Sequence, residues 1–175
     1  MRCFLAAAGC AMASACLTFL SGCDQESRPD EGAVDSRYVL ASEPADAKTP
    51  TELKDTLVDA ADVVVAGRID AGDLEPFEEG KATFVLTQLA DEEHAQGDPD
   101  HANKCPFCKR ELLNAPKVVV EFRDDDGIVI AQDARQMLGI RKGDAVVVVG
   151  TADYQEPINM IQVNATGVFR RSPEN

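Results

Sequence analysis

Four side chains that can bind a transition metal lie close together in the chain. They are the imidazoles of His94 and His101, its only two histidines, and the thiols of Cys105 and Cys108. Two imidazoles and two thiolates form a complete tetrahedral ligand set for a borderline-soft ion. The spacing therefore predicts a metal site for zinc or, as second choice, copper, with nearby carboxylates raising the local concentration of cations.

The segment Cys105-Pro106-Phe107-Cys108 has a second possible chemistry, because two such thiols can cycle between dithiol and disulfide. It resembles the active-site tetrapeptide of glutaredoxin-like proteins. That resemblance implies a thiol–disulfide oxidoreductase with Cys105 as attacking thiol and Cys108 as resolving thiol. In that family the motif follows a strand and opens a long helix, whereas here an acidic segment precedes it and Pro116 follows soon after.

A stable disulfide or an inert pair is the third interpretation of Cys105 and Cys108, because adjacent thiols outside the cytosol tend to oxidise. The three interpretations stay open at this point. Since the glutaredoxin-type context is missing, the sequence favours a binding or interaction module over an enzyme.

The beginning of the chain has the pattern of an export signal. Arg2 supplies positive charge, and an apolar stretch leads to Leu20-Ser21-Gly22-Cys23. This tetrapeptide resembles the lipobox of bacterial lipoproteins, which implies removal of residues 1–22 and a diacylglycerol on the Cys23 thiol. We therefore expect a lipoprotein anchored in a cell membrane through Cys23 and exposed outside the cytoplasm, on the periplasmic or outer face.

Composition narrows the range of partners. The chain has 31 acidic and 17 basic residues, a formal net charge of −14, and loss of Arg2 with the leader makes it more negative by one. Such a surface repels phosphate backbones, and the chain has no Trp and only 5% aromatic residues for stacking. Cations or a protein partner are favoured, and binding of nucleic acid or an oligosaccharide by the domain is the least favoured function.

The expected mature chain divides into a tether and one domain. Residues 23–50 are acidic and rich in Pro, Ser and Ala, which predicts a flexible tether with one apolar island at residues 38–40. The island could add a short edge strand, but its polar surroundings favour a solvated linker. Residues 51–172 are long enough to bury one core. The sequence Thr49-Pro50-Thr51-Glu52 has the pattern of a capped helix start at the boundary.

Strand signals dominate residues 51–172. β-Branched segments predict strands at residues 62–69, 81–89, 117–122, 144–150 and 160–169, with a short helix at residues 134–139. Three strands, a helix and two strands is the order of an OB-fold, and Gly67 could bend the first strand so that a barrel closes. We predict a mainly β domain, a small five-stranded OB-like barrel with one or two short helices. An open sandwich or another small barrel would have the same strand count.

On this scaffold, residues 90–116 form an insertion, a long loop between the second and third strands. Long loops in compact domains are usually functional or disordered. Four metal ligands would give this loop a reason to be ordered. The sequence therefore predicts that His94, His101, Cys105 and Cys108 converge at one point outside the barrel.

Overall fold

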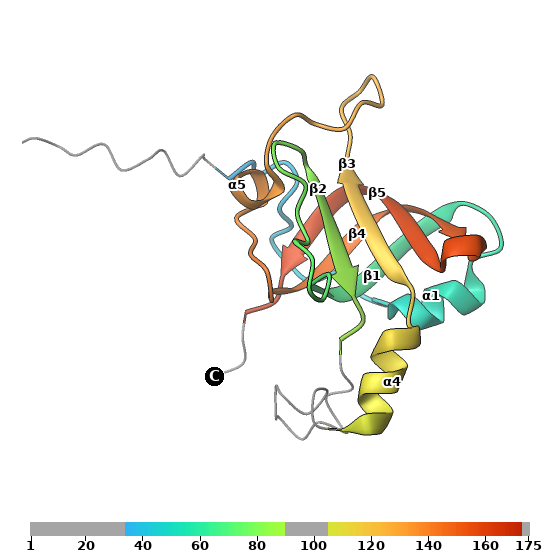
Figure 1. Cartoon of the computed structure of the whole chain (residues 1–175). Helices are drawn as coiled ribbons and strands as arrows, with labels where there is room; N and C mark the ends of the chain where they lie inside the picture. Colours follow the sequence, from blue (N-terminus) through green and yellow to red (C-terminus); the bar gives the residue numbers. More distant parts are fainter. Residues whose placement is uncertain (1–33, 90–104, 173–175) are drawn as a thin grey trace, which may run out of the picture.

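The computed structural model describes residues 34–89 and 105–172. One mixed sheet of five strands forms the body: β1 (Ala61–Ile69), β2 (Thr83–Thr87), β3 (Lys117–Phe122), β4 (Ala145–Gln155) and β5 (Met160–Arg170). The strands pair in the order β1-β2-β3-β5-β4, and β4 pairs again with β1, so that the sheet closes in a ring (Figure 1). All pairings are antiparallel except that of β3 with β5.

Three short α-helices accompany the sheet in the described residues: α1 (Pro50–Thr56), α4 (Pro106–Asn114) and α5 (Ala134–Leu138). The sequence predicted one or two short helices, and these residues contain one more. The capping box predicted at the start of α1 is confirmed, because the Thr49 side chain accepts from the Glu52 N–H while the Glu52 carboxylate accepts from the Thr49 N–H. The five strands and the mainly β class are also confirmed.

The interior of the ring is filled by alternating strand residues, as expected for a sheet with one buried face. Phe84 of β2 and Phe122 of β3 are fully buried, with their ring centroids 6.5 Å apart. Gly67 of β1 lies where a side chain would come within 2.9 Å of the Thr87 carbonyl oxygen. A glycine is needed there because β1 and β2 approach closely at this point.

The segment before α1 corrects the predicted extent of the tether. The tether was expected to reach residue 50, but residues 34–49 lie along the ring. Leu40 N–H donates to Val168 O at 2.8 Å, Val168 N–H donates to Tyr38 O at 2.8 Å, and the Tyr38 ring packs edge-on against Phe122. The apolar island at residues 38–40 therefore behaves as part of the sheet, because burying it and pairing its backbone outweigh the polar composition around it.

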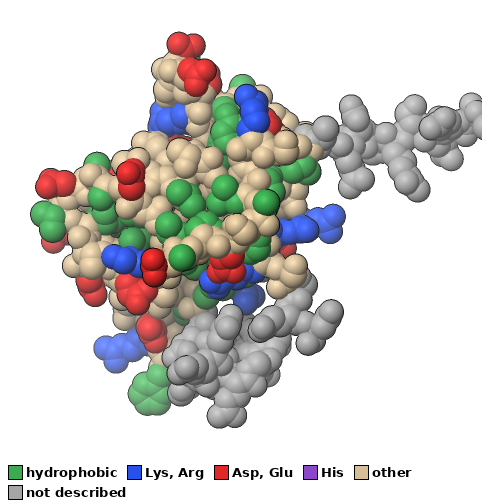
Figure 2. Space-filling view, turned by 180° about the vertical axis from the view of Figure 1, so that it is seen from behind, with side chains coloured by type: hydrophobic (Ala, Val, Ile, Leu, Met, Phe, Trp, Pro, Cys, Tyr) green, Lys and Arg blue, Asp and Glu red, His purple; other side chains and the backbone are tan. Residues whose placement is uncertain are grey.

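The described chain begins beside α5 and carries α4 at the other end of the ring (Figure 1). The Asp35 N–H donates to the Met137 carbonyl oxygen of α5, which fixes the first described residues there. On the face seen from behind, acidic and basic side chains lie mostly around the rim and apolar ones gather nearer the middle (Figure 2). No helix within residues 34–89 and 105–172 is long and apolar enough to cross a membrane.

Candidate dithiol site

Helix α4 places Cys105 and Cys108 in its first turn. Cys105 is the N-cap, with extended backbone angles and no side-chain capping bond, and Pro106 follows at the first helical position. Proline suits that position, because its fixed φ matches the helix and it has no N–H to leave unpaired. The described part of the predicted long loop is therefore a helix, which ends at Asn114 before the extended residue Ala115.

The two thiols differ in exposure. Cys108 is the buried residue of α4, with 9% of its surface exposed, whereas Cys105 is half-buried. No disulfide joins Cys105 and Cys108 in this structure, and a hydrogen bond joins the Cys108 side chain to that of Cys105. The chain thus brings a more accessible and a more buried thiol together at the start of one helix.

Burial raises the pKa of the Cys108 thiol, because desolvation disfavours its charged form. The hydrogen bond to Cys105 acts in the same direction, and so do the charges of Cys105 and Glu111. A metal ion that binds the Cys108 sulfur must therefore displace a tightly held proton.

A buried glutamine fastens α4 to the sheet and to α1. Gln88, just after β2, is 9% exposed. Its Oε1 accepts from the Thr51 N–H at 3.2 Å and from the Thr51 Oγ1 at 2.5 Å, and its Nε2 donates to Glu111 Oε1 at 3.4 Å. Sequence reasoning missed this link, because a single polar residue at the end of an apolar strand is usually exposed.

An open pocket of about 520 Å³ lies beside Cys108. It is bordered by Cys108 and Glu111 of α4, by Gln88, and by Thr49 and Thr51 at the start of α1. The buried thiol is therefore at the edge of a partly polar hollow and not in a closed core.

The outer face of α4 carries side chains that the fold leaves exposed. Phe107, between the two cysteines, is 82% exposed, and Leu113 is 71% exposed. Lys109 and Arg110 lie in the same helix and are exposed as well. The exposed face of α4 is therefore apolar and basic.

Two members of the predicted metal site, His94 and His101, lie outside the described residues, as does Cys23. The described residues bring together only Cys105 and Cys108 of the four predicted ligands. Within residues 34–89 and 105–172, no group of three or more His, Cys, Asp or Glu side chains could hold a metal ion. Convergence of all four ligands stays a prediction. No protein-family model, curated protein or solved structure matches this chain.

Proposed function

We propose that this protein is an extracytoplasmic binding module, anchored in the membrane through a lipidated Cys23, that binds zinc or copper. Cys105 and Cys108 would supply two sulfur ligands, and His94 and His101 would complete the set. The observation that carries the proposal is the contact between the two thiols in the first turn of α4. Two adjacent sulfurs on one helical turn can bind a single ion together.

We also propose that the ring is an OB-like barrel. The strand order β1-β2-β3-β5-β4, the parallel pairing of β3 with β5, and the position of α5 between β3 and β4 support it. The fold by itself names no ligand, so the functional proposal depends on the dithiol and not on the barrel.

The length of chain after Cys23 allows the domain to stand clear of the membrane. Eleven residue steps separate Cys23 from Val34, which an extended chain spans in at most about 40 Å. The described chain starts beside α5, so α4 lies at the end of the ring farther from this attachment (Figure 1).

A metal titration tests the proposal. Reduced protein freed of metal with a chelator is titrated anaerobically with Zn²⁺ and with Cu⁺ against a competing chromophoric chelator. The wild type should bind one equivalent of metal, and the double variant Cys105→Ser, Cys108→Ser should bind none. His94→Ala and His101→Ala should each weaken binding by at least about 10- to 100-fold, the loss typical when only an outer-shell partner of a ligand is removed. Asp125→Asn, in the acidic hairpin far from α4, is the matched control. Equal binding by the wild type and the double serine variant would refute the proposal.

The unequal environments of the thiols favour a second candidate, thiol–disulfide exchange. The Cys105 thiolate would attack one sulfur of a substrate disulfide, forming a mixed disulfide and releasing one substrate thiolate. Cys108, after losing its proton to solvent, would then attack the Cys105 sulfur and release the second substrate thiolate. An external dithiol would have to reduce the resulting disulfide for another turnover.

Two measurements separate this candidate from metal binding. Cys108→Ser should trap the mixed disulfide with a reporter disulfide such as that of insulin, because the resolving thiol is missing. A reduction potential for the pair below about −300 mV would indicate an inert structural bond. Absence of a trapped adduct together with such a potential would exclude exchange.

A further inference from the structure

The dithiol supplies only half of the ligands that a zinc ion takes in a closed site, which has four. A hydrogen bond joins the side chains of Cys105 and Cys108, and within residues 34–89 and 105–172 no group of three or more His, Cys, Asp or Glu side chains could hold a metal ion. Cys105 is half-buried and Cys108 borders an open pocket, so an ion bound to both sulfurs would remain open on one side. Two ligand positions can therefore be filled from outside this part of the chain.

The outer face of α4 beside the dithiol has apolar side chains that the described chain leaves in solvent. Phe107, between the two cysteines, is 82% exposed, and Leu113, near the end of the helix, is 71% exposed. With 3.6 residues per turn, Phe107, Arg110 and Leu113 lie within about a third of the circumference of the helix. Large apolar side chains that remain in water on one face favour association with another apolar surface.

Two cations accompany these apolar side chains. Lys109 and Arg110 are exposed, and none of the ion pairs among the described residues involves either of them. Four thiolates around one Zn²⁺ carry a net negative charge, because their four charges exceed the two of the ion, and nearby cations stabilise such a charge. Without the ion, the same cations on two copies of α4 would repel each other.

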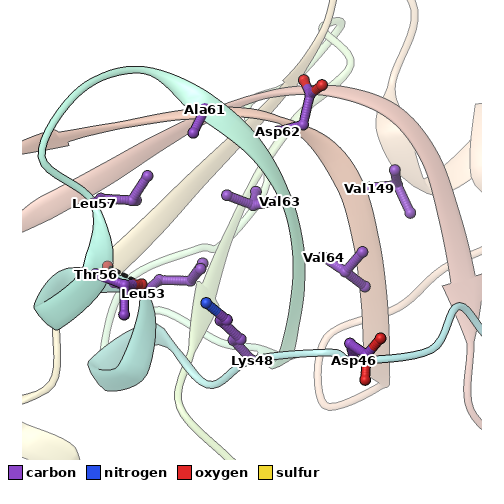
Figure 3. Close-up of a pocket in the computed structure, with 10 residues that line it drawn as sticks. All are labelled: Asp46, Lys48, Leu53, Thr56, Leu57, Ala61, Asp62, Val63, Val64 and Val149. Carbon is purple, nitrogen blue, oxygen red and sulfur yellow. Dashed lines mark hydrogen bonds between the residues drawn. The ribbon is translucent and has the colours of Figure 1, made fainter.

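A groove between α1 and β1 also has apolar walls, but it lacks this combination of groups. Leu53 and Val63 in its walls are already buried. Asp46 and Asp62 outnumber Lys48 among its charged lining residues, so the groove is acidic (Figure 3). The exposed apolar side chains and the unpaired cations of α4 therefore distinguish the surface beside the dithiol from this groove.

We infer that a second copy of this chain supplies the missing ligands, so that Cys105 and Cys108 of both copies bind one zinc ion. The inference rests on the proposed metal binding and concerns conditions in which the chains outnumber the ions by two to one or more. The four thiols release four protons to solvent as four zinc–sulfur bonds form. The exposed apolar side chains of the two α4 helices pack around the ion and exclude water. Thiolates suit soft ions, so sharing is favoured while thiolates are in excess.

Sedimentation velocity of reduced, metal-free protein tests the inference, with a phosphine reductant present so that no disulfide joins the copies. The protein should be a monomer without metal, a dimer with half an equivalent of Zn²⁺, and a monomer again when zinc is in excess. Co²⁺ in place of zinc reports the thiolates on each ion. Its sulfur-to-cobalt absorption per ion should be about twice as strong at half an equivalent as in excess. The double variant Cys105→Ser, Cys108→Ser should stay monomeric at every ratio.

The double variant Phe107→Gln, Leu113→Gln removes the apolar contact and keeps both thiols, so the zinc-bound dimer should dissociate at least about tenfold more readily. Ile128→Gln is the matched control and should leave the dimer unchanged. Ile128 is likewise exposed, at 64%, but it follows the end of β3 whereas α4 precedes the start of that strand. Thermal unfolding checks that each variant keeps its fold.

The result distinguishes this inference from the proposal on which it rests. If each chain binds one ion and has the mass of a monomer at every ratio of metal to protein, the inference is overturned and metal binding still stands. If the dimer forms equally well when Phe107 and Leu113 are replaced, the contact through α4 is wrong. If neither Zn²⁺ nor Co²⁺ binds at any ratio, both the inference and the metal site are overturned.

Discussion

Replacing Gln88 with alanine should loosen α1 from the end of β2, remove the hydrogen bond by which Gln88 reaches α4, and so make the buried thiol more accessible. Gln88 accepts two hydrogen bonds from Thr51, at 2.5 and 3.2 Å, and its longer contact with Glu111, at 3.4 Å, reaches α4. Each normal hydrogen bond contributes a net 0.5–1.5 kcal/mol or so. The two bonds to Thr51 therefore give a predicted loss of about 1–3 kcal/mol in the free energy of unfolding, with little added by the longer contact.

The same substitution should change the chemistry of Cys108, because that residue is the one α4 buries against the body. In a Cys105→Ser background, the rate at which Cys108 reacts with a disulfide reagent such as Ellman's reagent should rise several-fold on Gln88→Ala. Urea unfolding measures the stability, and the reaction is followed by absorbance in native buffer. The rate should rise even where the protein is fully folded, since local opening of α4 costs less than global unfolding.

The matched control is Gln155→Ala at the far end of β4. Gln155 Nε2 donates to Gln162 Oε1 of β5 at 3.1 Å, so the bond that this substitution removes joins β4 to β5 and not to α4 or α1. This substitution should lower the free energy of unfolding by about 1 kcal/mol or less and leave the rate of reaction of Cys108 unchanged. If Gln88→Ala is no more destabilising than this control and Cys108 reacts no faster, Gln88 does not hold α4 and the reasoning is wrong.

Three further predictions concern stability. The fold raises the pKa of Cys108, so the protonated thiol stabilises the folded state. This stabilisation is fully present below the pKa of the unfolded state and is lost as pH rises through the pKa of the folded state. Reduced wild type should therefore lose stability in urea above about pH 8.5, and Cys108→Ser should lose less. Gly150→Ala should lower the free energy of unfolding by about 2–3 kcal/mol, because a side chain there overlaps the β5 backbone. Gly127 has open space around it but a φ of +78°, so Gly127→Ala should lower it by only about 1–2 kcal/mol, measured by thermal unfolding. Tyr38→Ala should cost about 2 kcal/mol through lost packing on Phe122, and limited proteolysis should then cut near residue 38 first.

The elements that could be predicted from sequence are those specified by neighbouring residues. β-Branched runs such as those of β3 and β4 indicate strands by composition alone, and the start of α1 is specified by Thr49 and Glu52, three positions apart. These local signals were enough for the five strands and for the mainly β class.

Features that depend on contacts between distant parts of the chain could not be predicted in this way. The segment at residues 38–40 looked like part of a solvated tether because its partner, Val168, lies far away in the sequence. Gln88 bonds Thr51 across 37 positions, and nothing in its own surroundings identifies that partner.

The candidate site combines both kinds of information. The spacing of Cys105 and Cys108 indicated two thiols that could act together, but their position in the first turn of α4 and their unequal burial come from the docking of that helix. The burial of Cys108 matters because metal binding and thiol exchange require its thiol to lose the proton at different stages. As a ligand, Cys108 must lose its proton when the ion binds, so the raised pKa weakens affinity at neutral pH and makes it increase with pH. As a resolving thiol, it remains protonated while Cys105 attacks, so the first step of exchange does not depend on its titration. Metal binding therefore requires both thiols to lose their protons, whereas adduct formation by Cys108→Ser requires only that of Cys105, so metal affinity should rise more steeply with pH than the rate of adduct formation.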